Sequence, residues 1–324
     1  MENEMELIHS LGEAEAIAKI MIMNNDIDGL YGLRDIVLGG SIKGTSDEFH
    51  NFCVNYAARG DYESACNLLD IGLKQHSHST DLLADFLQYG IKCGRQSECK
   101  TYYERLLSIS RNYWTWRSFD FSIDYLKAAA TELHNTKKFE KTKNELLSLV
   151  EDFQNQMPFS EQPFLAKSEI YDFLGMHSEA VKALEDGVKS KRICPKCCLR
   201  YSDLMIKQGR YDVVLETTKK GIIASAQEQA TINIGYLFYL SGLAKDALIH
   251  ENENYNDETQ ILDVYTDYKI ASELLDKSRV EYLQMIKQRT LILELKSGIT
   301  FKTSEKNEKL LMLGDSSKIE DKKP

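Results

Sequence analysis

Residues 47–77 read DEFHNFCVNYAARGDYESACNLLDIGLKQHS, and their pattern predicts the architecture of the chain. Apolar and small side chains recur every three or four residues before Gly60 and again after it, which is the spacing of one face of a helix. Gly60 interrupts the pattern, because glycine readily ends a helix. The stretch therefore predicts two helices joined by a tight turn, with small residues such as Gly72 where the helices approach closely.

The same pattern returns further along the chain. In each copy a second glycine lies twelve residues after the first, in the pairs Gly60 and Gly72, Gly175 and Gly187, and Gly209 and Gly221. The first glycines of the last two copies are 34 residues apart. A period of this length, with helical spacing inside each copy, is typical of stacked helix pairs.

The order of residues within a copy resembles the tetratricopeptide repeat (TPR). In that family a large residue, a Leu-Gly or similar pair, an aromatic, a turn glycine, a second aromatic and a small residue follow one another. The matching residues of the first clear repeat are Phe49, Phe52-Cys53, Tyr56, Gly60, Tyr62 and Ala65. The resemblance extends from Asp47 to Gly298. It implies an all-α, right-handed α-solenoid of about six to seven antiparallel helix pairs.

Three regions are expected along the chain. Residues 1–45 form a degenerate N-terminal helical pair and a linker, residues 46–298 form the TPR-like α-solenoid, and residues 299–324 form a disordered, polar C-terminal tail. Within the solenoid we expect the sixth repeat to turn at Gly242 and residues 257–298 to supply a last helix pair. Nine extra residues near 113–126 are expected to lengthen the first helix of the third repeat.

Composition restricts the class of protein. The 324 residues include four prolines, and no apolar run approaches the roughly 20 residues that span a bilayer. The first residues are acidic and lack the basic start of a secretory signal. Seven cysteines, an odd number, are typical of reduced thiols. We therefore expect a cytoplasmic protein that does not insert into a membrane.

The charge is unevenly distributed. The formal net charge is −10, yet residues 189–220 hold nine basic and three acidic side chains. Overall acidity argues against non-specific binding to nucleic acid. The local reversal could attract a protein or peptide with acidic segments, although a solvated repeat surface with drifting charge accounts for it equally simply.

The motifs of catalysis and metal binding are weak. Cys194 and Cys197 form one Cys-x-x-Cys pair beside Cys198, whereas a structural zinc site needs four ligands, usually from two such pairs. No phosphate-cradling glycine loop or His-Glu-x-x-His helix is present in the sequence. We therefore expect no enzyme activity, no metal and no cofactor.

The resemblance implies that a ligand lies in the concave groove formed by the first helix of each repeat. Groove positions carried over to the earlier repeats are His50, Val54, Ala84, Gln88, Leu165, Glu169 and Asp172. In the fifth and sixth repeats the partner-binding candidates are Lys196, Arg200, Asp203, Lys207, Asn233, Tyr236 and Tyr239. The Lys/Asn/Arg set with which chaperone-binding TPR proteins grip a terminal carboxylate is absent.

A secondary candidate surface comes from the aromatic-rich residues 113–125. Trp114, Phe121 and Tyr125 share one helical face and are expected in the core, whereas Trp116 and Phe119 are expected to point elsewhere. Large rings are enriched at contact sites. The alternative is that the lengthened helix packs all of them against its neighbours.

The leading functional hypothesis is a non-enzymatic adaptor that binds a protein or peptide in its groove. The alternative is a regulatory or sensor solenoid of a signalling or transcription system, which binds a peptide or partner and changes its superhelix. A DNA-binding or catalytic domain encoded beside the chain would favour the alternative. The sequence does not identify the partner.

Overall fold

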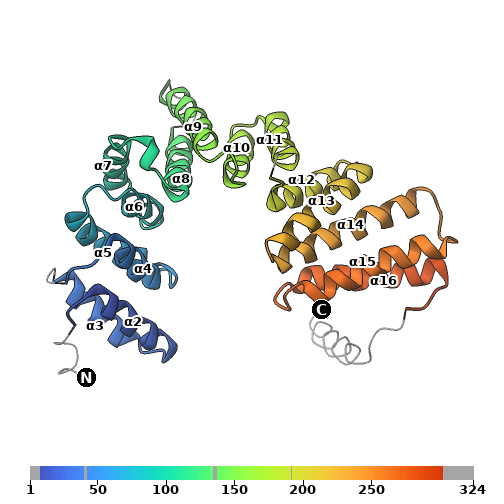
Figure 1. Ribbon diagram of the computed structural model, residues 1–324, viewed down its shortest axis with the longest axis horizontal. Helices are drawn as coiled ribbons and strands as arrows, with labels where there is room; N and C mark the ends of the chain where they lie inside the picture. The colour runs from blue at the N-terminus through green and yellow to red at the C-terminus, as the bar shows by residue number, and fades with distance from the viewer. Residues whose placement is uncertain (1–7, 40–41, 134–136, 191, 302–324) are drawn as a thin grey trace, which may run out of the picture. The chain divides into compact units, whose positions relative to one another are not determined.

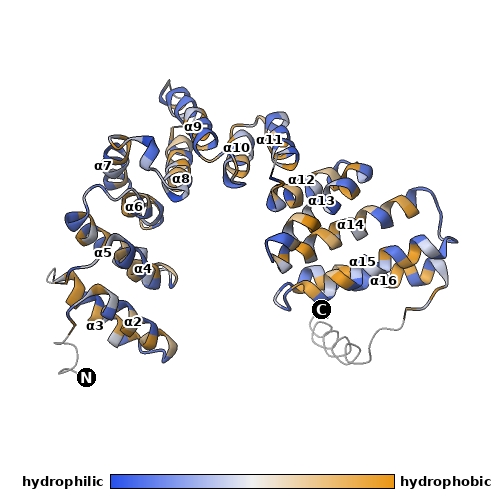
Figure 2. Cartoon of the chain, in the orientation of Figure 1, coloured by the Kyte–Doolittle hydropathy of each residue, from blue (hydrophilic) through white to orange (hydrophobic). Residues whose placement is uncertain are grey.

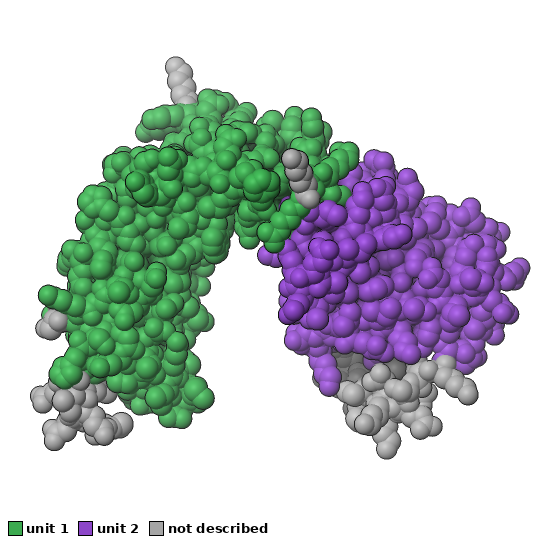
Figure 3. Space-filling model, in the orientation of Figure 1, with its two compact units in different colours: residues 1–192 green, residues 193–324 purple. Residues whose placement is uncertain are grey.

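The computed structural model describes residues 8–39, 42–133, 137–190 and 192–301. The regular elements within these ranges are all helices, which confirms the all-α prediction. The chain divides into two compact units, unit 1 with residues 1–192 and unit 2 with residues 193–324 (Figure 3). Each unit is built from helices that pack in pairs.

The described part of unit 1 contains ten α-helices and one short 3-10 helix (Figure 1). In chain order they are α2 (Leu11–Met23), α3 (Ile27–Leu38), α4 (Ser46–Ala57), α5 (Tyr62–Gln75), α6 (Thr80–Lys92), α7 (Gln96–Leu107), η1 (Arg111–Tyr113), α8 (Trp116–Glu132), α9 (Lys137–Gln156), α10 (Gln162–Phe173) and α11 (His177–Lys189).

The helices of unit 1 form two layers. Each even-numbered helix packs against the odd-numbered helix that follows it, so that α4 and α5, for example, form one hairpin. The even-numbered helices α2, α4, α6, α8 and α10 also pack against one another in chain order. One layer therefore consists of the first helices of successive pairs, as the repeat predicts. Figure 2 shows apolar and polar residues interleaved along each helix, as one buried face requires.

Local signals in the sequence explain where the helices begin and end. Thr45 caps α4, because its hydroxyl accepts from the Glu48 amide at 3.2 Å while the Glu48 carboxylate accepts from the Thr45 amide at 2.7 Å. The turn after α4 contains Gly60 at φ +83°, a conformation that glycine adopts without strain. The equivalent glycines Gly175 and Gly209 have φ values of +73° and +70°. The predicted repeat turns are thus confirmed.

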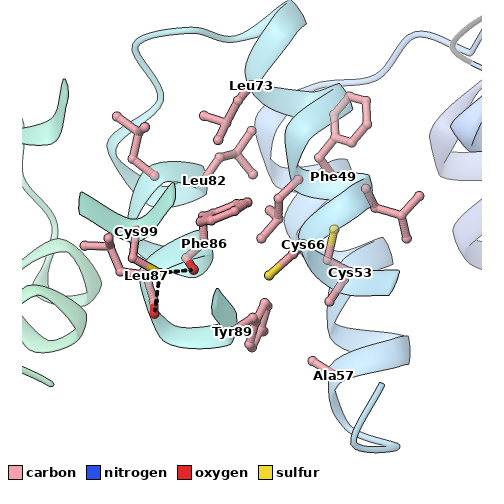
Figure 4. Close-up of a cluster of buried hydrophobic side chains, with 14 of the residues drawn as sticks. Phe49, Cys53, Ala57, Cys66, Leu73, Leu82, Phe86, Leu87, Tyr89 and Cys99 are labelled. Carbon is pink, nitrogen blue, oxygen red and sulfur yellow. Dashed lines mark hydrogen bonds between the residues drawn. The ribbon is translucent and has the colours of Figure 1, made fainter. Parts of the chain in front are cut away.

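The second glycine of the pattern permits close packing. A Cβ atom added to Gly72 of α5 would lie 2.8 Å from Cγ of Phe49 on α4, closer than packed carbon atoms approach. Figure 4 shows the core around this contact, where Phe49 and Cys53 of α4 face Cys66 of α5 and Phe86 of α6. These four side chains are fully buried. Burying such side chains is the main source of stability in each pair.

The described part of unit 2 contains five helices. They are α12 (Pro195–Lys207), α13 (Tyr211–Gln227), α14 (Thr231–Glu251), α15 (Glu258–Leu274) and α16 (Val280–Ser297). α12 packs against α13, and α14 packs against α15. α12 and α14 also contact each other, as first helices of successive pairs do in unit 1.

The predicted turn at Gly242 is wrong. α14 runs without interruption from Thr231 to Glu251, with Gly242 inside it. The glycine serves close packing instead, since a Cβ atom there would lie 2.7 Å from Cε1 of Tyr268 on α15. Consequently α15 is the second helix of the sixth pair, and α16 follows as a further single helix rather than as the second half of a last pair.

The extra residues of the third repeat are divided between two elements. η1 occupies Arg111–Tyr113, and α8 begins only at Trp116. The predicted lengthening is therefore partly a short 3-10 turn ahead of the helix. α8 itself has 17 residues, against 12 in α4.

Packed chain extends beyond the predicted end of the solenoid at Gly298. The Phe301 ring stacks on Tyr265 of α15, with ring centroids 4.0 Å apart, and its backbone amide donates to the Glu294 carboxylate at 2.7 Å. The predicted tail therefore includes at least three residues, 299–301, that belong to unit 2. The rest of the predicted tail, from residue 302 onward, lies outside the described residues, as do residues 1–7.

Candidate functional site

The predicted binding residues on α12 occupy one side of that helix. Lys196, Arg200, Asp203 and Lys207 follow one another at spacings of four, three and four residues, so they form a stripe. Lys196, Arg200 and Lys207 are exposed, and Asp203 is partly exposed. The stripe carries three cations and one carboxylate on the surface of unit 2.

Two members of this stripe bind each other. The Lys207 ammonium lies 2.6 Å from the Asp203 carboxylate, one helical turn away. The hydrogen bond and the charge of Asp203 raise the pKa of Lys207. A ligand that approaches this end of α12 would therefore meet an ion pair rather than a lone cation.

The predicted residues on α14 differ in accessibility. Asn233 and Tyr236 are partly exposed. Tyr239 is only 3% exposed, which contradicts its assignment as a groove residue that a partner can reach. Burial raises the pKa of the Tyr239 hydroxyl, with Arg289 opposing the effect and Tyr282 and Asp203 adding to it.

α16 covers Tyr239, a contact that no pattern in the sequence indicates. The Tyr282 ring meets Tyr236 edge to face at 5.0 Å and Tyr239 at 5.4 Å between centroids. The Tyr239 hydroxyl donates to Sδ of Met285 at 3.5 Å. Because α14 is not broken at Gly242, α16 takes the place beside α14 that the first helix of another pair would take.

These contacts join three helices into a single surface, which we call the α12–α14–α16 face. It consists of Lys196, Arg200, Asp203 and Lys207 on α12, Asn233, Tyr236 and Tyr239 on α14, and Tyr282 on α16. Asp203 and Tyr239 are close enough for the carboxylate to influence the tyrosine pKa. Arg200 and Tyr236 each lie three residues earlier in their helices, and α12 packs against α14. The face offers cations, an amide and two accessible rings side by side.

The two residues of the secondary candidate surface differ in accessibility. Trp116 is 47% exposed at the start of α8, and its ring meets Phe121 edge to face at 6.3 Å. Phe119 is fully buried, which contradicts the prediction that it points away from the core. Its ring stacks on Phe153 of α9 at 4.8 Å and 4°. The rings of Trp114 and Phe121 are buried as expected.

In unit 1 the first helices hold a charged cluster that sequence reasoning did not identify. His50 Nδ1 of α4 lies 2.6 Å from the Asp85 carboxylate of α6, and Arg117 of α8 lies 2.8 Å from His50 Nε2. A proton on Nδ1 lets the ring donate to Asp85 and accept from Arg117. Arg117 also lies 3.6 Å from Asp85 and 3.2 Å from Asp81. The side chain of Asp85 is only 1% exposed, and its carboxylate has a polar partner on each neighbouring first helix, His50 on α4 and Arg117 on α8.

The earlier groove positions are mostly accessible. Val54, Glu169 and Asp172 are exposed, His50, Gln88 and Leu165 are partly exposed, and Ala84 is buried against the prediction. Near Glu169, burial raises the pKa of Asp120 to about 6, with the charges of Asp124 and Glu169 adding to the effect. Lys127 bridges these acids, lying 3.4 Å from Asp124 and 3.9 Å from Glu169. This part of unit 1 is acidic, unlike the α12 stripe.

The cysteine motif lies in a packed region. Cys194 precedes α12 as its N-cap residue, and Cys197 and Cys198 lie in the first turns of α12. All three are buried. Within the described ranges no group of three or more His, Cys, Asp or Glu side chains is arranged to hold a metal ion. Of the helices described, none is both long enough and apolar enough to cross a membrane.

Comparison with known proteins gives structural similarity only. No protein-family model matches the sequence, and no curated protein matches it. Among solved structures, the chain is similar to TTC0263, a thermophilic TPR protein of Thermus thermophilus, with 16% identity, 57% of this chain and 94% of that chain covered, and a TM-score of 0.43.

Two further solved structures align over most of this chain. Human IFIT1 with m7Gppp-AAAA is 14% identical, with 90% of this chain and 65% of that chain covered, so this chain spans less than two thirds of that protein; the TM-score is 0.39. The P58(IPK) TPR domain is 12% identical, with 89% and 79% covered and a TM-score of 0.29. The helix pairing and turn glycines of the chain itself, rather than these alignments, describe it as a TPR-like helical-repeat protein.

Proposed function

We propose that this protein is a non-enzymatic adaptor that binds a protein or peptide segment on the α12–α14–α16 face. The observation that carries the proposal is that α12, with exposed Arg200, packs against α14, with the partly exposed Tyr236, whose ring is held edge to face by Tyr282. Arginine and tyrosine are the residue types that most often dominate binding at protein interfaces. Here α12 supplies the cation and α14, the first helix of the following pair, supplies the ring.

The chemistry of the face favours a partner segment with carboxylates. Lys196 lies one helical turn before Arg200, so both cations can approach one acidic group or two adjacent ones. Asn233 lies one turn before Tyr236 and adds an amide that can donate to and accept from a peptide backbone. A segment that combines acidic side chains with an apolar or aromatic residue would use the cations, the amide and the rings together.

Tyr282 fixes the ring surface before a partner binds. It contacts both Tyr236 and Tyr239, and Tyr239 is buried beneath it. Rings that are already held in place lose little conformational freedom on binding, which favours affinity. This supports a role for Tyr236 and Tyr282 as accessible anchors and for Tyr239 as their packed support.

Site-specific photo-crosslinking in the native source tests the proposal. A photoreactive residue replaces Arg200 in one variant and Lys219 in a control, since Lys219 is an exposed cation on α13, the second helix of the same pair. We expect one set of partner peptides, enriched in acidic residues, to attach at position 200 and not at position 219. The same peptides at both positions, or none at position 200, would contradict the proposal.

A nucleic-acid partner is tested in parallel. Cations beside aromatic rings also suit a single-stranded nucleic acid, whose bases stack on rings. We therefore expect an RNA oligonucleotide of mixed sequence to bind no more tightly to the wild type than to Arg200→Glu. Tight RNA binding that is lost in Arg200→Glu would overturn the assignment of a protein segment as the partner.

A further inference from the structure

α16 has an unusual burial pattern for the last helix of a packed unit. Of its 18 residues only Ile286 and Leu293 are buried. Five large apolar side chains are exposed, and the exposed fraction reaches 76% at Leu295. The exposed set is Val280, Met285, Leu291, Ile292 and Leu295.

Two of the exposed apolar residues, Leu291 and Leu295, lie on one stripe of α16 together with two glutamines. At 3.6 residues per turn, Gln284, Gln288, Leu291 and Leu295 follow one another along the side of α16 opposite Ile286. Their spacing of four, three and four residues is that of a seam between two helices. None of these four side chains is charged, and the two leucines are strongly exposed for apolar residues.

The position of α16 explains why this face is open. α12 and α14 each pack against a second helix, α13 and α15 respectively. α16 lies beside α14 through the Tyr282 contacts, as a further first helix would. Of the described helices, α15 is the one that packs extensively on α16. The face that a second helix would cover in a complete pair is therefore exposed within the described chain.

We propose that a second copy of this chain covers α16, with the two α16 helices packed antiparallel about a two-fold axis. Two identical surfaces pair most simply in this way. The axis passes between Gln288 and Leu291, so that Gln288 of one copy faces Leu291 of the other. In the neighbouring layer Gln284 faces Leu295.

The flanking residues favour the antiparallel arrangement. Beside the seam, Lys287 of one copy faces Glu294 of the other, whose carboxylate also accepts from the Phe301 amide of its own chain, and the two-fold axis repeats this pair of opposite charges. On the other flank Met285 faces Ile292, so two exposed apolar side chains cover each other. A parallel arrangement would instead bring Lys287 beside the apolar Ile292 and lose both charge pairs. Charge complementarity thus identifies a second copy, in one orientation, as the occupant.

Sedimentation of the full chain across two decades of concentration tests the proposal. We expect a reversible monomer–dimer equilibrium that Leu291→Glu weakens at least about tenfold, because the change buries a charge at the centre of the seam. The matched control is Ile20→Glu, which alters a 58% exposed side chain on α2 of unit 1 and should leave dimerisation unchanged. A wild-type chain that stays monomeric, or equal effects of the two variants, would overturn the proposal.

A charge exchange tests the orientation. Lys287→Glu should weaken the dimer, because each new carboxylate faces Glu294 of the other copy, and adding Glu294→Lys should restore it. Failure of the second change to restore dimerisation in a chain with an unchanged melt would overturn the antiparallel register.

The chain's own residues 302–324 are the competing occupant. Ending the chain after Phe301 should leave the dimer unchanged, and a dimer that forms only in the shortened chain would show that those residues cover α16 instead.

Discussion

Tyr239 and Tyr282 meet edge to face, with ring centroids 5.4 Å apart and an interplanar angle of 87°. The contact joins α14 to α16, although the sequence pattern assigned them to different helix pairs. It buries Tyr239 and leaves Tyr236 and Tyr282 as the rings that a partner can reach. The α12–α14–α16 face therefore depends on α16, a helix for which the sequence predicted no binding residue.

Tyr282→Ala should destabilise unit 2 by about 2 kcal/mol, because it removes two edge-to-face contacts and part of the cover over Tyr239. Denaturant unfolding measures the change. Tyr113→Ala is the control, since that ring is 74% exposed and its loss should alter stability by less than about 0.5 kcal/mol. Equal effects of the two substitutions would show that α16 is not fixed to α14 through this ring.

Gly242→Ala should destabilise the protein by about 1–3 kcal/mol, although alanine is the better residue in a helix interior. The added Cβ would lie 2.7 Å from Cε1 of Tyr268, whose ring is fully buried. Thermal unfolding shows directly whether the substitution lowers or raises the stability. A stabilised variant would mean that α14 and α15 do not approach as closely as described.

Asp120→Asn should stabilise the protein by about 1–2 kcal/mol at pH 7.5, a value reduced for the partial exposure of the side chain. The pKa of Asp120 is raised from 3.8 to about 6, so the folded state favours the protonated acid. The cost of ionising Asp120 is thus absent below pH 3.8, grows between pH 3.8 and 6, and is complete above pH 6.

Melting temperatures of wild type and Asp120→Asn should therefore converge as the pH falls toward 4. Asp186→Asn, on an exposed position of α11, is the control and should give no such pH-dependent difference. A constant difference at all pH values would contradict the assignment of the raised pKa to Asp120.

Arg117→Met should cost about 3 kcal/mol, because it leaves the 1% exposed carboxylate of Asp85 with His50 as its remaining close partner. Urea unfolding gives the loss, and Arg59→Met, at an exposed position, serves as the control. In an Asp85→Asn background the loss should shrink, since the buried charge is gone. The same loss in both backgrounds would place the effect elsewhere.

Periodicity and turn glycines were enough to predict the helices, most of their pairing and the repeat turns. Gly60, Gly175 and Gly209 mark turns because only a residue without a side chain adopts positive φ freely. The prediction of a turn at Gly242 was wrong because glycine also occurs inside helices where two helices pack closely. A single sequence does not distinguish a turn glycine from a packing glycine. Contact with Tyr268, 26 residues away, decides between them.

The candidate site was predicted only in part for the same reason. The α12 stripe follows from spacing within one helix, and Lys196 and Arg200 lie on the surface as expected. The burial of Tyr239 depends on Tyr282, which lies 43 residues further along the chain. The His50, Asp85 and Arg117 cluster likewise joins three helices, so no local pattern in the sequence indicates it.

Partner affinity of two charge-reversed variants tests the adaptor proposal most directly. Arg200→Glu and Lys219→Glu change net charge equally, on the first and second helix of the same pair. For the partner captured at position 200, calorimetry should show that Arg200→Glu loses about 2 kcal/mol or more, roughly thirtyfold in affinity, while Lys219→Glu binds like the wild type. Equal affinity of the two folded variants would show that the partner does not bind on the α12–α14–α16 face.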